Sequence, residues 1–166
     1  MLKQSEQGET MRKRSNYRPK PVILNTMAYV MSGMMPMVNL KDKLVSLQLK
    51  NHFALDDLRM GKATKNDIDT LIAAFNITEA LAEQKIGDEY QQEIKQAQDA
   101  LYECAKRGVE MNYRFIVKGP ELKAINFVMQ LHDEQLKAAT VKYIEVATNY
   151  VNQCLTQKRA RPILSK

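Results

Sequence analysis

The most regular feature of the chain is an apolar stripe in its last third. Its members recur at alternating spacings of three and four residues, which is the pattern of one buried face of an α-helix. They are Leu122, Ile125, Met129, His132, Leu136, Ala139, Tyr143, Val146 and Tyr150. Gly119-Pro120-Glu121, just before the stripe, is typical of a helix start. The pattern therefore predicts one helix from about residue 120 to about residue 155.

A helix of this length constrains the rest of the fold. About 35 residues at about 1.5 Å per residue span about 50 Å, which is longer than any other helix that the sequence predicts. Such a helix either kinks or projects from the body of the protein. A projecting amphipathic end needs a second copy of the chain or another protein to cover it. We therefore expect self-association as a homodimer or contact with a partner.

Shorter apolar stripes predict four more helices. They cover about 26–32, 40–60, 64–87 and 88–108. The helix from Thr64 has Asp67 in the position of a capping-box acid. We predict an all-α fold with four main helices in an antiparallel bundle-like array and one short Met-rich helix. The β-leaning stretch 109–118 predicts either an extended connection across the helices or a strand edge offered to a partner.

The positive charge of the chain is concentrated at its two ends. The formal net charge is +6, yet residues 1–20 and 156–166 each carry a net of +4. Ten of the 25 basic and two of the 19 acidic residues lie in these ends, which leaves a net of −2 for the remainder. We predict a flexible basic arm over 1–21, a single helical domain over 22–155 and a basic tail over 156–166.

These basic ends suggest one alternative function, since arms of this kind can track the phosphates of a nucleic acid. The nucleic-acid-binding residues would be Arg12, Lys13, Arg14, Arg18, Lys20, Lys158, Arg159 and Arg161. The other interpretation is that the ends are solvated segments that contact nothing.

Methionine is clustered near the beginning of the predicted domain. Five of the ten methionines fall within eleven residues: Met27, Met31, Met34, Met35 and Met37. Such a cluster serves either as packing for an irregular core or as an adaptable binding surface. As candidate partner-binding residues we take these methionines together with Tyr143 and Tyr150, on the outer part of the last helix.

The sequence offers little catalytic or metal-binding chemistry. His52 and His132 are the only histidines, and with Asn51 and Asn76 they are expected to form a buried polar cluster between helices. The alternative is that one of them is a general base or metal ligand. Cys104, Cys154 and the histidines lack the close spacing of zinc ligands. No nucleophile elbow or phosphate-binding glycine loop is found. We therefore expect no cofactor and no enzymatic activity.

Length and composition indicate a soluble protein. No apolar run approaches the roughly 18 residues of a membrane span. The beginning of the chain lacks the apolar stretch of a secretory signal. Two cysteines cannot form a disulfide scaffold, so the expected compartment is a reducing cytoplasm.

Several short segments of the chain resemble a known group of proteins. They include Tyr17-Arg18-Pro19-Lys20-Pro21-Val22, Leu49-Lys50-Asn51-His52, Ala63-Thr64 with Asp67, Asn76 with Glu79-Ala80-Leu81, and Leu131-His132-Asp133. In these segments the chain resembles small, uncharacterised helical accessory proteins of prophages and other mobile elements of proteobacteria, over most of 17–140. The resemblance implies binding to host machinery, such as defence, transcription or replication complexes. It assigns no catalytic residue.

The resulting expectation is a non-enzymatic interaction protein. It would be an accessory or anti-defence factor that binds and modulates a host protein or nucleoprotein complex. The alternative is a nucleic-acid-binding regulator that uses its basic arms.

Overall fold

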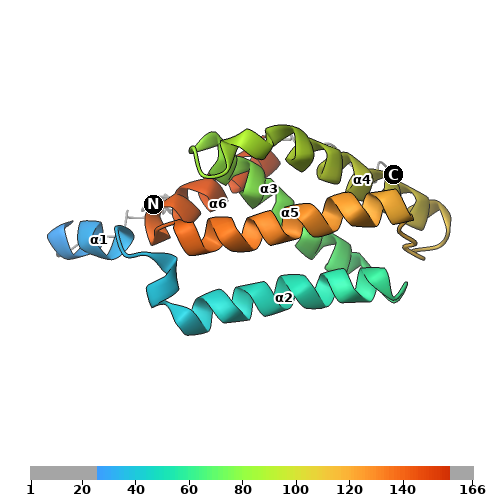
Figure 1. Cartoon of the computed structure of the whole chain (residues 1–166), viewed down its shortest axis with the longest axis horizontal. Helices are drawn as coiled ribbons and strands as arrows, with labels where there is room; N and C mark the ends of the chain where they lie inside the picture. Colours follow the sequence, from blue (N-terminus) through green and yellow to red (C-terminus); the bar gives the residue numbers. More distant parts are fainter. Residues whose placement is uncertain (1–25, 158–166) are drawn as a thin grey trace, which may run out of the picture.

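The computed structural model describes residues 26–157, and these residues are helical in almost every segment (Figure 1). The all-α class is confirmed, and within the described residues the only β-type pairing is one isolated bridge between Pro36 and Thr140. The α-helices are α1 (Thr26–Gly33), α2 (Lys41–Arg59), α3 (Lys65–Glu83), α4 (Gln91–Glu110), α5 (Gly119–Ala138) and α6 (Val141–Thr156). Two short 3₁₀ helices, η1 (Met37–Asn39) and η2 (Asp88–Tyr90), precede α2 and α4. Five long helices therefore follow α1, and their antiparallel arrangement stays a prediction.

Local signals in the sequence set several helix ends. The capping box before α3 is confirmed, because the Thr64 amide donates to the Asp67 carboxylate at 2.7 Å and the Asp67 amide donates to the Thr64 hydroxyl at 3.4 Å. Gly61 closes α2 with a left-handed backbone, φ 68°. At the other end of α3 the predicted stop at Gly87 is wrong, since the helix ends at Glu83.

The end of α3 is a Schellman motif built without glycine at its left-handed position. Lys85 takes that position with φ 70°, and its amide donates to the Ala82 carbonyl at 2.9 Å. The Ile86 amide donates to the Leu81 carbonyl at 3.0 Å, and the two side chains pack together. Helix α3 therefore ends at Glu83, four residues before the glycine, Gly87, that the sequence analysis took as its end.

The single long helix predicted over 120–155 is wrong. Ala139 and Thr140 have extended backbones, with ψ of 153° and 164°, and they divide the segment into α5 and α6. The break is tied to the chain before α2: the Met37 amide donates to the Ala139 carbonyl at 3.0 Å, and the Val141 amide donates to the Met35 carbonyl at 2.9 Å. These bonds offset part of the cost of interrupting the helix, and they lie in tertiary structure that a local pattern does not contain.

After the break, α6 packs back onto α3 instead of projecting. Ala80 of α3, Ala147 of α6 and Ala139 are buried at this contact, together with the larger side chain of Leu81. Small residues let two helices approach closely. The reason for expecting self-association through a projecting end of this helix is therefore removed.

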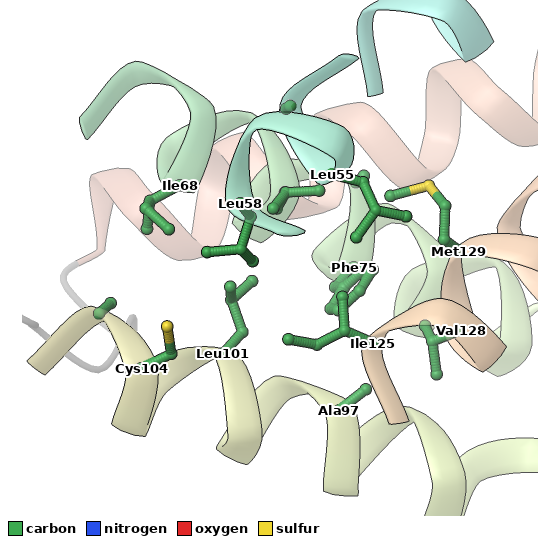
Figure 2. Close-up of a cluster of buried hydrophobic side chains, with 14 of the residues drawn as sticks. Leu55, Leu58, Ile68, Phe75, Ala97, Leu101, Cys104, Ile125, Val128 and Met129 are labelled. Atoms are coloured by element: carbon green, nitrogen blue, oxygen red, sulfur yellow. The ribbon is translucent and has the colours of Figure 1, made fainter. Parts of the chain in front are cut away.

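The core lies around α3, which contacts all four other long helices. Figure 2 shows its largest cluster, in which Phe75 of α3 meets side chains from α2, α4 and α5. The fully buried members include Leu58, Leu71, Leu101, Ile125, Val128 and Met129.

The β-leaning stretch 109–118 forms no strand; its first two residues belong to α4, and the remainder is a connection that begins with a turn. Helix α4 continues past the predicted stop at Gly108 to Glu110, and the chain then turns and runs back along the helix. The ring of Phe115 is buried directly against Gly108, where a larger residue would leave no room for it. The Arg107 guanidinium holds the connection in place. It donates two hydrogen bonds to the Glu121 carboxylate, at 2.6 and 2.8 Å, and one to the Ile116 carbonyl at 3.2 Å. Of the two interpretations of this stretch, the connection across the helices is confirmed.

Candidate partner-binding surface

Four of the five clustered methionines are exposed. Met27, Met31 and Met34 of α1 and its following turn are 69%, 66% and 67% exposed, and Met35 is 37% exposed. The prediction of Met37 as a partner-binding residue is wrong, because only 7% of this residue is exposed and it belongs to the core. Each interpretation of the cluster therefore holds for a different segment: the methionines of α1 are exposed, and Met37 of η1 packs in the core.

The predicted tyrosines lie on the outer side of α6. Tyr143 and Tyr150 are each 43% exposed, and Val146 lies between them on the same side of the helix. The opposite side of α6 faces α3, where Ala147 is buried and Ile144 and Val151 are partly buried.

The structure brings α1, which carries the exposed methionines, against the beginning of α6, the helix that carries the two tyrosines. Figure 1 shows α1 beside the start of α6 and away from the other helices. A Cβ placed on Gly33, at the end of α1, would be 3.5 Å from the Cβ of Lys142, so the two helices touch there. We call this region the α1–α6 surface and define it by the exposed residues Met27, Val30, Met31, Met34, Tyr143, Val146 and Tyr150.

Charged side chains are almost absent from the segments that form the α1–α6 surface. Residues 26–40 contain none, and residues 138–157 contain only Lys142 and Glu145. The other 30 charged residues of the described part lie between 41 and 137. Depletion of charge with enrichment of Met and Tyr is the composition of the buried centre of protein interfaces. Val30 and Val146 were missed by the sequence analysis, although their helical spacing from Met34 and Tyr143 was a signal for them.

The candidate nucleic-acid-binding residues lie outside the described residues. They are Arg12, Lys13, Arg14, Arg18, Lys20, Lys158, Arg159 and Arg161. Over the described residues themselves, acidic residues outnumber basic residues by two.

The two histidines do not meet in one buried cluster. His132 is buried on α5, and its Nδ1 lies 2.9 Å from the Thr78 hydroxyl. That hydroxyl donates its proton to the Ala74 carbonyl at 2.9 Å, so the Nδ1–H of a neutral His132 donates to Thr78. Burial lowers the pKa of His132 to about 4, and the imidazole is therefore uncharged at neutral pH.

The other members of the buried group differ from those predicted. Gln135 joins His132, and its amide donates to the carbonyls of Thr78 and Ile86 at 3.1 and 2.6 Å. Asn51 is buried, as expected, while Asn76 is only half-buried. The group joins α5 to α3 and fixes how the two helices pack, which is a structural role.

His52 lies on the surface of α2 and not in the core. Its Nε2 is 2.6 Å from a carboxylate oxygen of Asp133, and the pair links α2 to α5. Nearly half of the His52 side chain is exposed. The prediction of His52 as a buried residue is wrong.

The described residues provide no cluster for metal binding, as no three His, Cys, Asp or Glu side chains converge there. Cys104 is fully buried, and burial raises the pKa of its thiol to about 11. A thiol with this pKa carries almost no thiolate at neutral pH, which makes it a poor nucleophile.

One exposed apolar feature was not singled out from the sequence. Val45, Leu49 and Phe53 form a row on the outer side of α2, which we call the α2 ridge. Their spacing of four was visible, but the neighbouring stripe of Leu44, Leu47, Leu55 and Leu58 accounted for the helix without them.

Within residues 26–157 no helix combines the length and the apolar character that crossing a membrane requires. Comparison with known proteins adds no relative: no protein-family model, curated protein or solved structure matches the chain.

Proposed function

We propose that this chain is a non-enzymatic interaction protein that binds a host protein or nucleoprotein complex through the α1–α6 surface. The observation that carries the proposal is the segment 26–40, which contains no charged residue and in which Met27, Met31 and Met34 are each about two-thirds exposed. Isolated exposed apolar residues are ordinary, but Met27, Met31 and Met34 share one face of α1 by their spacing of four and three, and such a set marks a candidate interaction site. Methionine side chains suit such a site because they adapt to the shape of a partner.

The setting of the proposed function is a phage or mobile element acting inside a host cell. The resemblance to prophage accessory proteins supports an accessory or anti-defence role, exerted by modulating host machinery in the cytoplasm. The buried polar group and the protonated Cys104 thiol both have structural explanations, which supports a role without catalysis.

A capture experiment with matched variants tests the proposal. The full chain is immobilised and exposed to a proteobacterial lysate, with and without nuclease. The double variant Met31→Glu/Met34→Glu introduces two charges into the surface, and Met111→Glu is the control, because Met111 is 49% exposed on a different part of the molecule.

The proposal requires a specific protein that is retained by the wild type and by Met111→Glu, and that is lost with the double variant. Charges buried in an interface without partners are strongly unfavourable, so the loss is expected to be at least about tenfold. Equal capture by all three proteins would refute the α1–α6 surface as the binding site.

A nucleic-acid-binding regulator is the alternative, supported by the +4 net charge of each chain end. It predicts that the isolated protein binds DNA or RNA, and that binding weakens as salt rises. Replacement of Arg12, Lys13, Arg14 and Arg18 by alanine would abolish this binding. The α1–α6 double variant would leave it unchanged, which separates the two functions.

A further inference from the structure

Helix α1 exposes one continuous apolar face. The Met34 amide donates to the Val30 carbonyl at 3.1 Å, so the helical geometry of α1 extends to Met34. Because successive residues are about 100° apart around a helix, four side chains then fall within an arc of about 100°: Val30, Met34, Met27 and Met31. At least half of each is exposed. Gly33, where α1 touches α6, points well away from the middle of this arc, so the α1 face is turned away from that contact.

A run of positive charge precedes the α1 face in the chain. Five of the nine residues from 12 to 20 are basic and none is acidic, while residues 21–40 carry no charge at all. Lys20 and Met27 are seven residues apart, which keeps them within about 25 Å of each other in any conformation. The chain itself therefore holds a strongly basic run close to an apolar helix face.

The position of α1 lets a large surface reach it. Figure 1 shows α1 at the outer end of the described helices. The described charges that follow α1 most closely in the chain are Lys41, Asp42 and Lys43, and on α6 the helix touches Lys142, with Glu145 one turn further along. These five charges sum to +1, so they do not repel a negatively charged surface.

We propose that α1 anchors this chain to the surface of an anionic lipid bilayer. The α1 face enters the boundary between headgroups and acyl chains, and the basic residues of 12–20 contact the negatively charged headgroups. Both parts are needed, because stable attachment of a peripheral protein takes two signals. A nucleic acid offers phosphates but no apolar layer for the methionines, which favours the bilayer. Helix α1 is about 12 Å long and lies in the interface, since crossing the bilayer core requires about 30 Å.

Vesicle sedimentation with the full chain tests the anchor. The wild type should bind phosphatidylcholine vesicles that contain about 30% phosphatidylglycerol at least about tenfold more tightly than vesicles of phosphatidylcholine alone. Added salt should weaken this binding, because it screens the attraction between the basic residues and the headgroups. Failure of the wild type to bind the anionic vesicles would overturn the proposal, and so would equal binding to both kinds of vesicle.

Three variants test whether both parts are needed. Met31→Ser/Met34→Ser removes apolar area without changing the charge, and it should weaken binding to the anionic vesicles at least about tenfold. Met60→Ser/Met111→Ser is the matched control and should bind like the wild type, since both of these methionines are exposed outside α1. A third variant should lose at least about tenfold as well, because it carries alanine in place of Arg12, Lys13, Arg14 and Arg18. Full binding by either the α1 variant or the alanine variant would refute the two-part anchor.

The sequence contains no tryptophan, which allows a direct readout of insertion. Met31→Trp places the single tryptophan of the chain on the α1 face. Its emission should shift to shorter wavelength when anionic vesicles are added, because the indole moves from water to the headgroup–acyl boundary. Met111→Trp is the control and should show no shift. A shift in both variants, or in neither, would contradict the insertion of α1.

The same variants separate this inference from the proposed function, on which it does not depend. Lipid anchoring needs both α1 and the basic residues, whereas capture of a host protein needs α1 and nucleic-acid binding needs the basic residues. A chain that captures a host protein but binds no vesicles would refute the anchor and leave the proposed function standing. Vesicle binding without a captured protein would support the anchor and count against the proposed function.

Discussion

The ionisation of His132 is coupled to the stability of the fold, because this side chain is buried. Its imidazole is buried between α3 and α5 and is hydrogen-bonded to Thr78 in the uncharged form. A buried base of this kind resists protonation, because a charge without compensation inside the protein is costly.

The low pKa of His132 makes stability depend on pH. Its pKa is about 4 in the folded protein and 6.5 in the unfolded chain, so as pH falls the unfolded chain takes up the proton first. The free energy of unfolding should therefore decrease from pH 6.5 down to about 4, by about 3 kcal/mol from this residue, and the loss should level off below pH 4. Urea denaturation at pH 7 and pH 4.5 measures the effect.

Two variants isolate the contribution of His132. His132→Gln should be less stable than the wild type at pH 7 but should lose less stability between pH 7 and 4.5. His52→Gln, which changes the exposed histidine in the same way, is the matched control. A pH dependence that is unaltered by His132→Gln would show that other groups cause it.

The residue types alone did not reveal which histidine is buried. Both histidines lie near apolar stripes, and the sequence pattern treats them alike. The difference arises from the position of α2, whose buried side is formed by Asn51, Leu55 and Leu58 and leaves His52 outside. The stripe of α5 placed His132 correctly, because that helix buries the side on which the stripe lies.

Among the helices, the break between α5 and α6 is the largest departure from the sequence pattern. The residues around it, Ala138-Ala139-Thr140-Val141, contain no glycine or proline, and the apolar stripe continues through them in register. Local propensity therefore predicts a continuous helix. The break depends on contacts with residues 35–37, which are far away in the sequence.

A proline at position 140 distinguishes a broken helix from a continuous one. Thr140 has φ −90° and ψ 164°, and the two hydrogen bonds of the junction are donated by Met37 and Val141, so Thr140→Pro removes neither. We expect a change in the free energy of unfolding of less than about 1 kcal/mol. Gln130→Pro, at an exposed position inside α5, is the control and should cost about 3 kcal/mol or more. Thermal or urea denaturation measures both, and a comparable loss in the two variants would contradict the break.

Gly108 shows how a helix and the connection that follows it are fitted together. It lies inside α4, where the sequence indicated a helix end, and the ring of Phe115 occupies the space above it. Glycine lowers helix propensity, yet here its missing side chain makes room for a buried aromatic ring.

Alanine at position 108 should therefore destabilise the protein in spite of its higher helix propensity. The new methyl group would overlap the Phe115 ring, and we expect a loss of about 1–3 kcal/mol. Gly119→Ala is the matched control, because no atom lies within 4 Å of the added Cβ there. Chemical denaturation of the two variants checks the prediction, which fails if Gly108→Ala is as stable as the wild type.

At the scale of the whole molecule, stability is distributed unevenly. Helix α3 is in contact with α2, α4, α5 and α6, whereas α1 exposes its methionines and touches the body near Gly33. A helix of eight residues has little stability without tertiary packing.

This unevenness predicts a gradient of hydrogen exchange. Amides of α1 should exchange with almost no protection, and those in the middle of α3 should exchange only through global unfolding. Exchange followed by mass spectrometry measures both, and occupation of the α1–α6 surface by a partner should slow α1 selectively. Protection of α1 equal to that of α3 in the free protein would contradict the gradient.

The sequence predicted the all-α class and the positions of α2, α3 and α4 to within a few residues, and it left the methionine cluster open between packing and a surface. The class and the helix positions could be predicted because they depend on local periodicity and on charge. The exposed α2 ridge, the burial of Met37 and the junction of α1 with α6 could not be predicted, because they depend on how distant segments pack.

The bridge between Pro36 and Thr140 has a consequence for the order of events during synthesis. It joins segments about 100 residues apart, so α1 and α6 cannot be brought together until the residues around Thr140 have left the ribosome. In a nascent chain that still lacks α6, the methionines of α1 would have no helix to pack beside. The proposed α1–α6 surface is thus completed only after α2, α3, α4 and α5 have all been synthesised.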